Sequence, residues 1–221
     1  TVDNTNHTVT GTINVGGQAI TVTYSNPQGW AFVQTGNTGT NYWTVSPSSS
    51  ASPYESTSVA NKPNTSGIIA LRYAGSQTLT FSQSVENLAF DVVSLNGNGY
   101  GFNQDFTIVS YTGSNVGGLG TAGSGYWGSG TFTKTNPSAG TYNLNGTSGE
   151  PHGTILFTSS FTSLTWNSLS NENWNGFTVG VNSASSQNAN VTFNGAVGTV
   201  ALGDISITGN LTTTAAINSA A

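Results

Sequence analysis

The chain has 221 residues, of which only 5% are charged, and its formal net charge is −5. Three basic residues are too few to bind nucleic acid or an anionic membrane surface, and no stretch approaches the roughly 20 apolar residues of a membrane span. The absence of Cys excludes disulfides and thiol chemistry.

Alternating apolar and polar residues predict β-strands along most of the chain. The first are 8–14 and 18–24, which Val15-Gly16-Gly17 joins as a hairpin, and 30–33 follows. We predict long loops at 34–66, where the periodicity is weak, and a Gly- and Asn-rich loop at 96–104. The other predicted strands are 68–73, 77–82, 87–95, 106–111, 131–133, 153–158, 162–167, 177–181, 190–194 and 198–208.

About a dozen short strands without convincing helical periodicity predict an all-β fold. We expect a two-sheet antiparallel β-sandwich of jelly-roll-like type, with 87–95, the most apolar strand, near its centre. The pairs 68–73 with 77–82 and 153–158 with 162–167 are predicted hairpins. We expect 1–208 to form one domain and 209–221 to be a flexible tail or a strand donated to another copy.

The strongest site candidate flanks the second of these hairpins. Antiparallel pairing of 153–158 with 162–167 would bring the residues before the first strand close to those after the second. Glu150 and His152 would then gather with Glu172 and Trp174 at one end of the sheet. We favour a structural role for the two Glu and His152, as acceptors of loop hydrogen bonds; a metal site and a carboxylate pair that hydrolyses glycosides are the alternatives.

Several aromatic residues lie in or beside predicted loops rather than in strands. Flat rings on a surface rich in Asn and Ser suit sugar binding, because the rings stack on sugar faces while amides, such as that of Asn173, bond hydroxyls. The alternative is that the rings cover the ends of the sandwich as hydrophobic lids. The residues concerned are Tyr42, Trp43, Tyr126, Trp127 and Trp174.

Oxygen ligands at short spacing indicate Ca²⁺ as a candidate cofactor, and the sequence indicates no other. Asp91 and Asp105 flank the Gly- and Asn-rich loop, which also carries Asn96 and Asn98, but this loop is foremost typical of turns. Asp204 begins the last predicted strand, where analogy with jelly-roll carbohydrate modules suggests a structural Ca²⁺.

Three groups of residues form a pattern across 67–181. They are Ile68-Ile69-Ala70-Leu71 with Thr80-Phe81-Ser82 and Val85-Glu86-Asn87; Ser94-Leu95 with Phe106-Thr107-Ile108 and Tyr126-Trp127-Gly128; and Gly149-Glu150-Pro151-His152-Gly153 with Glu172-Asn173-Trp174-Asn175-Gly176-Phe177. The pattern resembles a domain of secreted bacterial proteins of the PEP-CTERM type. In that domain a Gly stands in place of Pro151 and a second His in place of Asn175, so any role of that His is missing here. The resemblance implies export to the cell envelope or extracellular matrix, and no particular activity.

Hydroxyl and amide side chains in place of ionic ones also favour an extracellular, secreted protein, and a start at Thr1 without Met is compatible with a removed signal peptide. Our first hypothesis is a non-enzymatic structural or adhesion protein of the bacterial surface or biofilm matrix, which self-associates into filaments by strand donation. The alternatives are a carbohydrate-binding module that recognises surface glycans and a glycan hydrolase using Glu150 and Glu172. We expect neither nucleic-acid binding nor membrane insertion.

Overall fold

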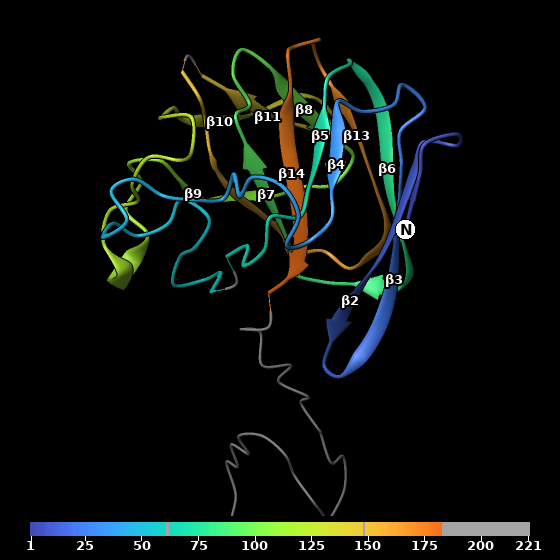
Figure 1. The fold of residues 1–221 in the computed structure, drawn as a ribbon, viewed down its shortest axis with the longest axis horizontal. Helices are drawn as coiled ribbons and strands as arrows, with labels where there is room; N and C mark the ends of the chain where they lie inside the picture. Colours follow the sequence, from blue (N-terminus) through green and yellow to red (C-terminus); the bar gives the residue numbers. More distant parts are fainter. Residues whose placement is uncertain (61, 148, 183–221) are drawn as a thin grey trace, which may run out of the picture. The chain divides into compact units, whose positions relative to one another are not determined.

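The computed structural model describes residues 1–60, 62–147 and 149–182, and these form two antiparallel β-sheets (Figure 1). One sheet has, in spatial order, β1 (Val2–Asp3), β2 (Thr8–Val15), β3 (Gln18–Ser25), β6 (Gly75–Val85), β13 (Phe161–Ser168), β8 (Gly99–Phe102), β11 (Thr141–Gly146) and β10 (Phe132–Ser138). The other has β4 (Phe32–Gln34), β5 (Ile68–Leu71), β14 (Asn175–Val181), β7 (Leu88–Val93), β12 (Gly153–Phe157) and β9 (Thr107–Tyr111). The predicted all-β, two-sheet sandwich is confirmed.

The main core lies between the two sheets. In β7, Leu88, Phe90 and Val92 belong to this core, and the Phe90 ring stacks on Phe177 of β14 with centroids 4.9 Å apart. Trp166 of β13 meets Phe90 from the opposite sheet, edge to face. Because β7 lies between β14 and β12, the most apolar strand is central, as predicted. Truncation of a ring buried this deeply costs about 3–5 kcal/mol.

Both hairpins that we predicted after residue 67 are wrong. The strands β5 and β6 belong to different sheets, and so do β12 and β13. Alternation shows which residues of a strand face the core. Two successive strands show the same alternation whether they pair in one sheet or face each other across the sandwich, so alternation cannot distinguish the two arrangements. Short connections therefore carry the chain from one sheet to the other at both places.

The predicted loop at 96–104 contains a strand, β8, and β11 was also missed. Gly in β8 and Asn in β11 lower the strand propensity of these segments, yet the glycines of β8 permit close packing. A Cβ on Gly99 would lie 2.9 Å from the carbonyl oxygen of Leu144, and one on Gly101 would lie 2.9 Å from Oδ1 of Asn143. The β8–β11 pairing therefore depends on the two missing side chains.

Long loops cover the outer face of the six-stranded sheet. The described residues between β4 and β5 form only isolated bridges, in agreement with the long loop predicted there. Ser46 pairs with Ser124 and Ala51 lies beside Ala122, which joins this loop to the Gly-rich segment that carries the 3-10 helix η1 (Gly117–Leu119). Beneath them, Trp43, Tyr54, Ile68 and Val93 form a second apolar cluster. This face of the sheet is thus a second, smaller core.

Within the described ranges, no helix is long and apolar enough to cross a membrane. The predicted strands 190–194 and 198–208, the tail 209–221 and Asp204 lie outside the described residues.

Candidate functional site

The residues before β12 and those before β14 lie at one end of the sandwich. Both strands pair antiparallel with β7, through Gly153 with Val92 and Gly176 with Val93, so they run in the same direction and begin at the same end. Glu150 and His152 precede β12, whereas Glu172 and Trp174 precede β14. The gathering that we predicted is therefore present, although the paired strands that bring it about are not those we expected.

Glu150 fixes the turn that follows β7. Its carboxylate accepts hydrogen bonds from the Ser94 hydroxyl and from Nδ2 of Asn96, the latter at 2.7 Å. Ser94 has a φ of +59°, a left-handed conformation uncommon for Ser, and its bond to Glu150 holds the residue there. The Glu150 backbone N–H donates to Ser129 at 2.9 Å. Glu150 thus joins the turn after β7 to the Gly-rich loop, in accord with the structural hypothesis for this residue.

Glu172 lacks such partners. Both of its carboxylate oxygens are shielded from solvent, and neither has a hydrogen-bond partner in the described part of the chain. Burial raises the pKa of Glu172 to about 7, the nearby Asn175 amide opposes the rise, and the charge of Glu150 adds to it. The Asn175 amide nitrogen is close enough to affect this pKa but not placed for a hydrogen bond to the carboxylate. Glu172 therefore carries a proton during part of the time at neutral pH.

Asn175, which lies near Glu172, is bonded to the opposite sheet. The hydroxyl of Tyr100, from β8, donates a hydrogen bond to Oδ1 of Asn175. Burial raises the pKa of the Tyr100 hydroxyl well above its usual value, so this group stays protonated and remains a donor. The position that carries a second His in the resembling domain thus carries an amide that bridges the sheets.

His152 is fully buried. Its Nδ1 lies 2.9 Å from the Tyr54 hydroxyl, whereas its Nε2 has no hydrogen-bond partner among the residues that the structure describes. Burial lowers the pKa of His152 to about 4, so the imidazole is neutral at neutral pH. His152 therefore belongs to the packing beneath the loops rather than to a shared site with Glu150 and Glu172.

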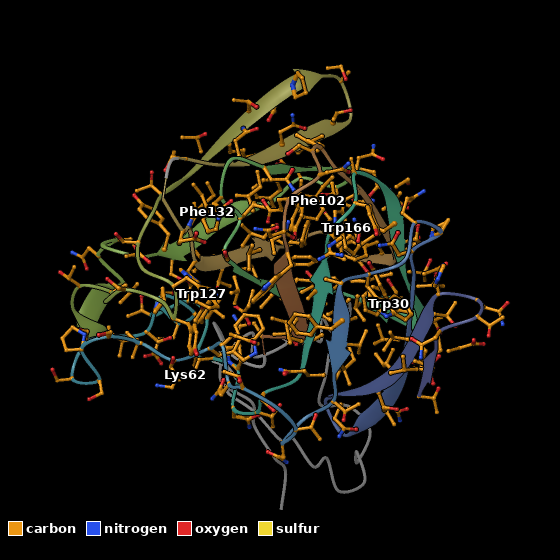
Figure 2. All side chains as sticks on the ribbon, turned by 45° about the horizontal axis from the view of Figure 1, so that its top comes forward. Trp30, Lys62, Phe102, Trp127, Phe132 and Trp166 are labelled. Carbon is orange, nitrogen blue, oxygen red and sulfur yellow. The ribbon has the colours of Figure 1, made fainter. Side chains whose placement is uncertain are left out.

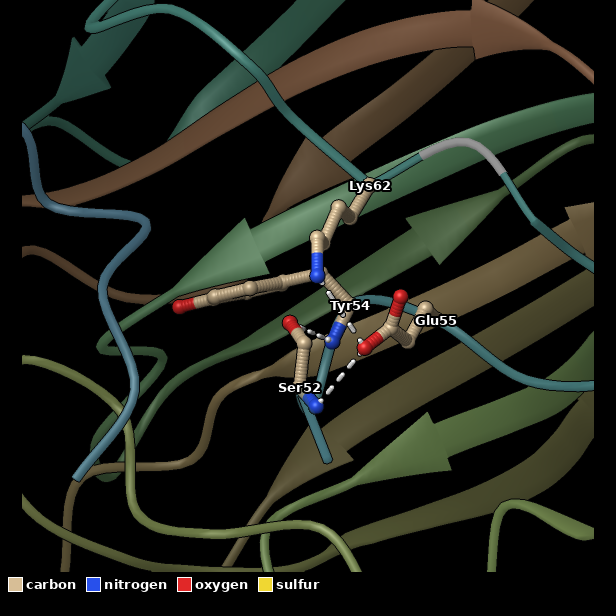
Figure 3. Close-up of polar contacts among 4 residues, drawn as sticks. All are labelled: Ser52, Tyr54, Glu55 and Lys62. Atoms are coloured by element: carbon tan, nitrogen blue, oxygen red, sulfur yellow. Dashed lines mark hydrogen bonds and ion pairs between the residues drawn. The ribbon is translucent and has the colours of Figure 1, made fainter. Parts of the chain in front are cut away.

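The loop that carries Tyr54 is ordered by local polar contacts (Figure 3). The Tyr54 N–H donates to Oγ of Ser52 at 3.1 Å, and the Ser52 N–H donates to Oε1 of Glu55 at 3.0 Å. Lys62 forms an ion pair with the same Glu55 oxygen at 3.3 Å. Sequence reasoning missed Tyr54, for which the one available indication was a large aromatic residue inside a Ser- and Pro-rich loop.

Asp91 lies in a polar row on the outer face of the six-stranded sheet. Thr178, Asp91, Thr154 and Ser110 stand side by side on four neighbouring strands. The Thr154 hydroxyl donates to Asp91, and burial raises the pKa of Asp91 to about 8. This carboxyl group is therefore mostly protonated at neutral pH.

The structure does not bring together the acids that we considered for Ca²⁺. Asp91 stands in one row with Ser110, which is near the end of β9. Asp105 precedes the start of β9 and forms an ion pair with Lys134, so the two acids lie toward opposite ends of this strand. Within residues 1–60, 62–147 and 149–182 there is no group of three or more His, Asp or Glu residues that could hold a metal ion. Asn98 uses its side chain to bond Gly99, Ser168 and Ser170, which agrees with a turn role.

Four aromatic rings from three separate segments gather near this end of the sandwich. They belong to Tyr42, Tyr126, Trp127 and Trp174, which we call the aromatic cluster (Trp127 is labelled in Figure 2). Tyr42 contacts each of the other three rings, with centroid distances of 4.9–6.3 Å. The side chains of Tyr126 and Trp127 are 42% and 49% exposed, whereas Tyr42 and Trp174 are partly buried beside them. The exposed rings thus stand on a supporting aromatic layer.

Trp43 is not part of this surface, which corrects our expectation of a stacking platform there. It is 5% exposed, its indole N–H donates to the Gly67 carbonyl at 3.1 Å, and its ring packs against Tyr54. Trp43 is a lid over the smaller core, as the alternative hypothesis held. Asn173, by contrast, is exposed beside Trp174, and its carbonyl accepts a hydrogen bond from Nε of Arg72 at 3.3 Å.

The loop that carries Tyr126 and Trp127 rests on the residues before β12. Gly125 packs so closely on the His152 ring that a Cβ there would overlap it, and a Cβ on Gly130 would lie 2.8 Å from Pro151. The Gly128 N–H donates to the Gly125 carbonyl at 3.2 Å, which closes a four-residue turn with the two aromatic residues at its centre. His152 and Pro151 therefore support the aromatic cluster from below.

We compared the chain with models of known protein families, with curated proteins and with solved structures, and none of them matches it. The resemblance to the PEP-CTERM-type domain stays a prediction.

Proposed function

We propose that this chain is a non-enzymatic extracellular adhesion protein that binds glycans through its aromatic cluster. The observation that carries the proposal is the exposure of two adjacent large rings, Tyr126 and Trp127, on a chain with very few charges. Leaving apolar area in water costs about 25 cal/mol per Å². A ligand that covers these rings recovers that free energy on binding.

The chemistry around the rings fits a sugar. A sugar ring has apolar C–H faces that stack on aromatic rings, and hydroxyl groups that need hydrogen-bond partners. Asn173 is exposed next to Trp174, and the neighbouring loops are rich in Ser, Thr and Asn. The low charge of the chain favours recognition by stacking and neutral hydrogen bonds over ionic pairing. These features support an extracellular role in contact with surface or matrix glycans.

We assign no hydrolytic role to Glu150 and Glu172 in this proposal. Hydrolysis of a glycoside needs two carboxylates that reach the scissile bond. The Glu150 carboxylate is occupied by Ser94 and Asn96, and the Glu172 oxygens are shielded from solvent. We propose instead that Glu150 positions the loops beneath the aromatic cluster through its bonds to Ser94 and Asn96.

A glycan array followed by isothermal titration calorimetry tests the proposal. We expect the chain to bind one class of glycan in the presence and in the absence of EDTA. The Trp127→Ala variant should weaken binding at least about tenfold, which corresponds to about 1.4 kcal/mol. Leu169→Ala, which removes another exposed apolar side chain, should leave the affinity unchanged. An array without binding, or equal losses in the two variants, would contradict the proposal.

Self-association through open sheet edges is a second candidate, favoured by one groove. A cavity of about 280 Å³ lies where β1 and β2 approach β4 and β5, and β1 and β4 are edge strands. Its apolar lining includes Val2, Val9, Val33 and Ile69. An extended segment of a second copy could add its backbone hydrogen bonds to such an edge.

Electron microscopy of the purified chain tests this second candidate. The donor predicted from the sequence, 209–221, lies outside the described residues, so its deletion is the direct test. Filaments formed by the full chain and lost on deletion, with an unchanged melting temperature, would support assembly. A full chain that stays monomeric at high concentration would contradict it.

A further inference from the structure

Arg72, the residue that follows β5, is the one Lys or Arg side chain that forms no ion pair within the described residues. The other two are Lys62, which pairs with Glu55, and Lys134, which pairs with Asp105. Arg72 is exposed, and its guanidinium donates one hydrogen bond, from Nε to a neutral backbone carbonyl. The two Nη groups have no partner in the described part of the chain, so they are free to bind an acceptor from outside.

Strand pairing places this guanidinium beside Trp174 of the aromatic cluster. The ring of Trp174, which precedes β14, reaches across β5 to Phe32 of β4, with centroids 5.1 Å apart. Phe32 pairs with Ala70 of β5, and Arg72 lies two residues beyond Ala70, on the same face of the sheet by alternation. The carbonyl that accepts the Arg72 hydrogen bond, at 3.3 Å, belongs to Asn173 and is bonded directly to the Trp174 nitrogen. Arg72 therefore borders the aromatic cluster.

The two acids at this end of the sandwich leave the charge of Arg72 uncompensated. The Glu172 N–H donates to the Arg72 carbonyl at 3.1 Å, but the Glu172 carboxylate is shielded from solvent. The pKa of Glu172 is raised by burial, and Asn175 and Glu150 are the groups that modify it, so Arg72 does not act on this carboxylate. The Glu150 carboxylate is held by two hydrogen bonds within the turn after β7. The solvent side of the aromatic cluster thus presents one free positive charge.

From these observations we propose that the aromatic cluster and Arg72 together bind an acidic glycan, with the carboxylate of a uronic acid on the guanidinium. The inference rests on the proposed glycan-binding function and adds one ionic contact to its neutral ones. Trp174 connects the two parts, because its ring lies 6.3 Å from that of Trp127 and its backbone adjoins the carbonyl that holds Arg72. A planar carboxylate can accept two parallel N–H bonds from the two Nη groups, whereas a sugar hydroxyl cannot. Neutral glycans bind by stacking alone, and more weakly.

Ligands that differ only in charge provide the test. Tetramers of β-1,4-linked glucuronic acid, of its methyl ester, of glucose and of 6-O-sulfated glucose are titrated into the full chain by calorimetry. The uronic acid tetramer should bind at least about threefold more tightly than the methyl ester and the glucose tetramer, the scale of an exposed but bidentate ion pair. This preference should shrink when NaCl is raised from about 50 to about 500 mM, because salt screens exposed charges.

Two variants assign the preference to one cation. Arg72→Gln should bind the uronic acid tetramer no better than its methyl ester, with the affinity for the glucose tetramer changed by less than about twofold. Lys134→Gln removes the same charge from a side chain already paired with Asp105, and should keep the preference. Equal affinities for acid and ester in the parent, or a preference that survives in Arg72→Gln, would overturn the inference and leave the proposed function standing. A sulfated tetramer that binds as tightly as the uronic acid would overturn the assignment to a carboxylate.

A failure of the proposed function itself has a different outcome. It would be indicated by the absence of binding to all four tetramers, or by binding that Trp127→Ala leaves unchanged. Melting temperatures of the three variants, expected within a few degrees of the parent, confirm that each is folded.

Discussion

Nδ1 of His152 lies 2.9 Å from the hydroxyl of Tyr54, a residue 98 positions earlier in the chain. Both side chains are fully buried, and the contact ties the long loop after β4 to the start of β12. Because Gly125 packs on the same imidazole, this pair also supports the turn that carries Tyr126 and Trp127. The stability of the smaller core and the shape of the aromatic cluster are therefore coupled.

Removal of the Tyr54 hydroxyl should destabilise the chain. The Tyr54→Phe variant leaves a buried imidazole nitrogen without a partner, which costs about 1–3 kcal/mol. Urea unfolding followed by tryptophan fluorescence measures the change. Tyr73→Phe, at an exposed position, should stay within about 0.5 kcal/mol of the parent. Equal stabilities of the two variants would show that the His152 contact contributes nothing.

Acid should destabilise the chain through His152. The folded pKa of about 4 lies below the usual 6.5, so the stability that the neutral ring provides is complete above about pH 6.5 and is lost as the pH falls toward 4. Glu172 acts in the opposite direction, because its pKa is raised. The test therefore measures how much the unfolding free energy falls between pH 7 and pH 4.5, first in the parent and then in His152→Gln. The loss should be smaller in this variant, and His7→Gln should behave like the parent.

Alkali should act through Asp91. Its folded pKa of about 8 is above the usual 3.8, so the stability provided by the protonated, buried carboxyl is complete below about pH 3.8 and is lost as the pH rises through 8. Asp91→Asn keeps an oxygen that can accept the Thr154 hydrogen bond and carries no charge. We expect it to stabilise the chain at pH 9 by roughly 4 kcal/mol relative to its effect at pH 5. Asp105→Asn, at an exposed position, serves as the control, and the same pH trend in both variants would contradict the assignment.

A single methyl group should disturb the aromatic cluster from below. In Gly125→Ala the added Cβ overlaps the His152 ring, so the turn 125–128 must shift. We expect a stability loss of about 1–3 kcal/mol, and weaker glycan binding. Gly118→Ala is the matched control, because a Cβ at Gly118 meets no atom within 4 Å. Unchanged binding by a folded Gly125→Ala variant would show that the His152 contact does not position Tyr126 and Trp127.

The fold class followed from the sequence, but the pairing of strands did not. The hairpin β2–β3 has a turn with two glycines in left-handed conformation between clearly alternating strands, so local rules were sufficient there. For β12 and β13 the alternation predicted strands correctly and left their partners open. The partners, β7 with β9 and β6 with β8, lie up to about 90 residues away in the chain and are chosen by packing of the whole core.

The two Tyr-Trp pairs show the same limit at the candidate site. Tyr42-Trp43 and Tyr126-Trp127 look equivalent in the sequence, yet Trp43 is buried and Trp127 is about half exposed. What separates them is the long-range contact of Trp43 with Gly67 and Tyr54 and the turn that displays Trp127. Glu150 and Glu172 were predicted at one end from a hairpin of β12 with β13 that does not form; they lie there because β12 and β14 both pair antiparallel with β7.

Glycan binding at the aromatic cluster is tested most directly by the indole N–H signals of the five Trp residues in ¹⁵N NMR spectra. Each signal is assigned by substitution, and tetramers of β-1,4-linked glucose and of β-1,4-linked N-acetylglucosamine are added stepwise. We predict that the signal of Trp127 moves most and that of Trp174 moves less, while Trp30, Trp43 and Trp166 stay in place. Spectra in which no indole signal moves, or in which Trp127 stays while a buried indole shifts, would contradict the account.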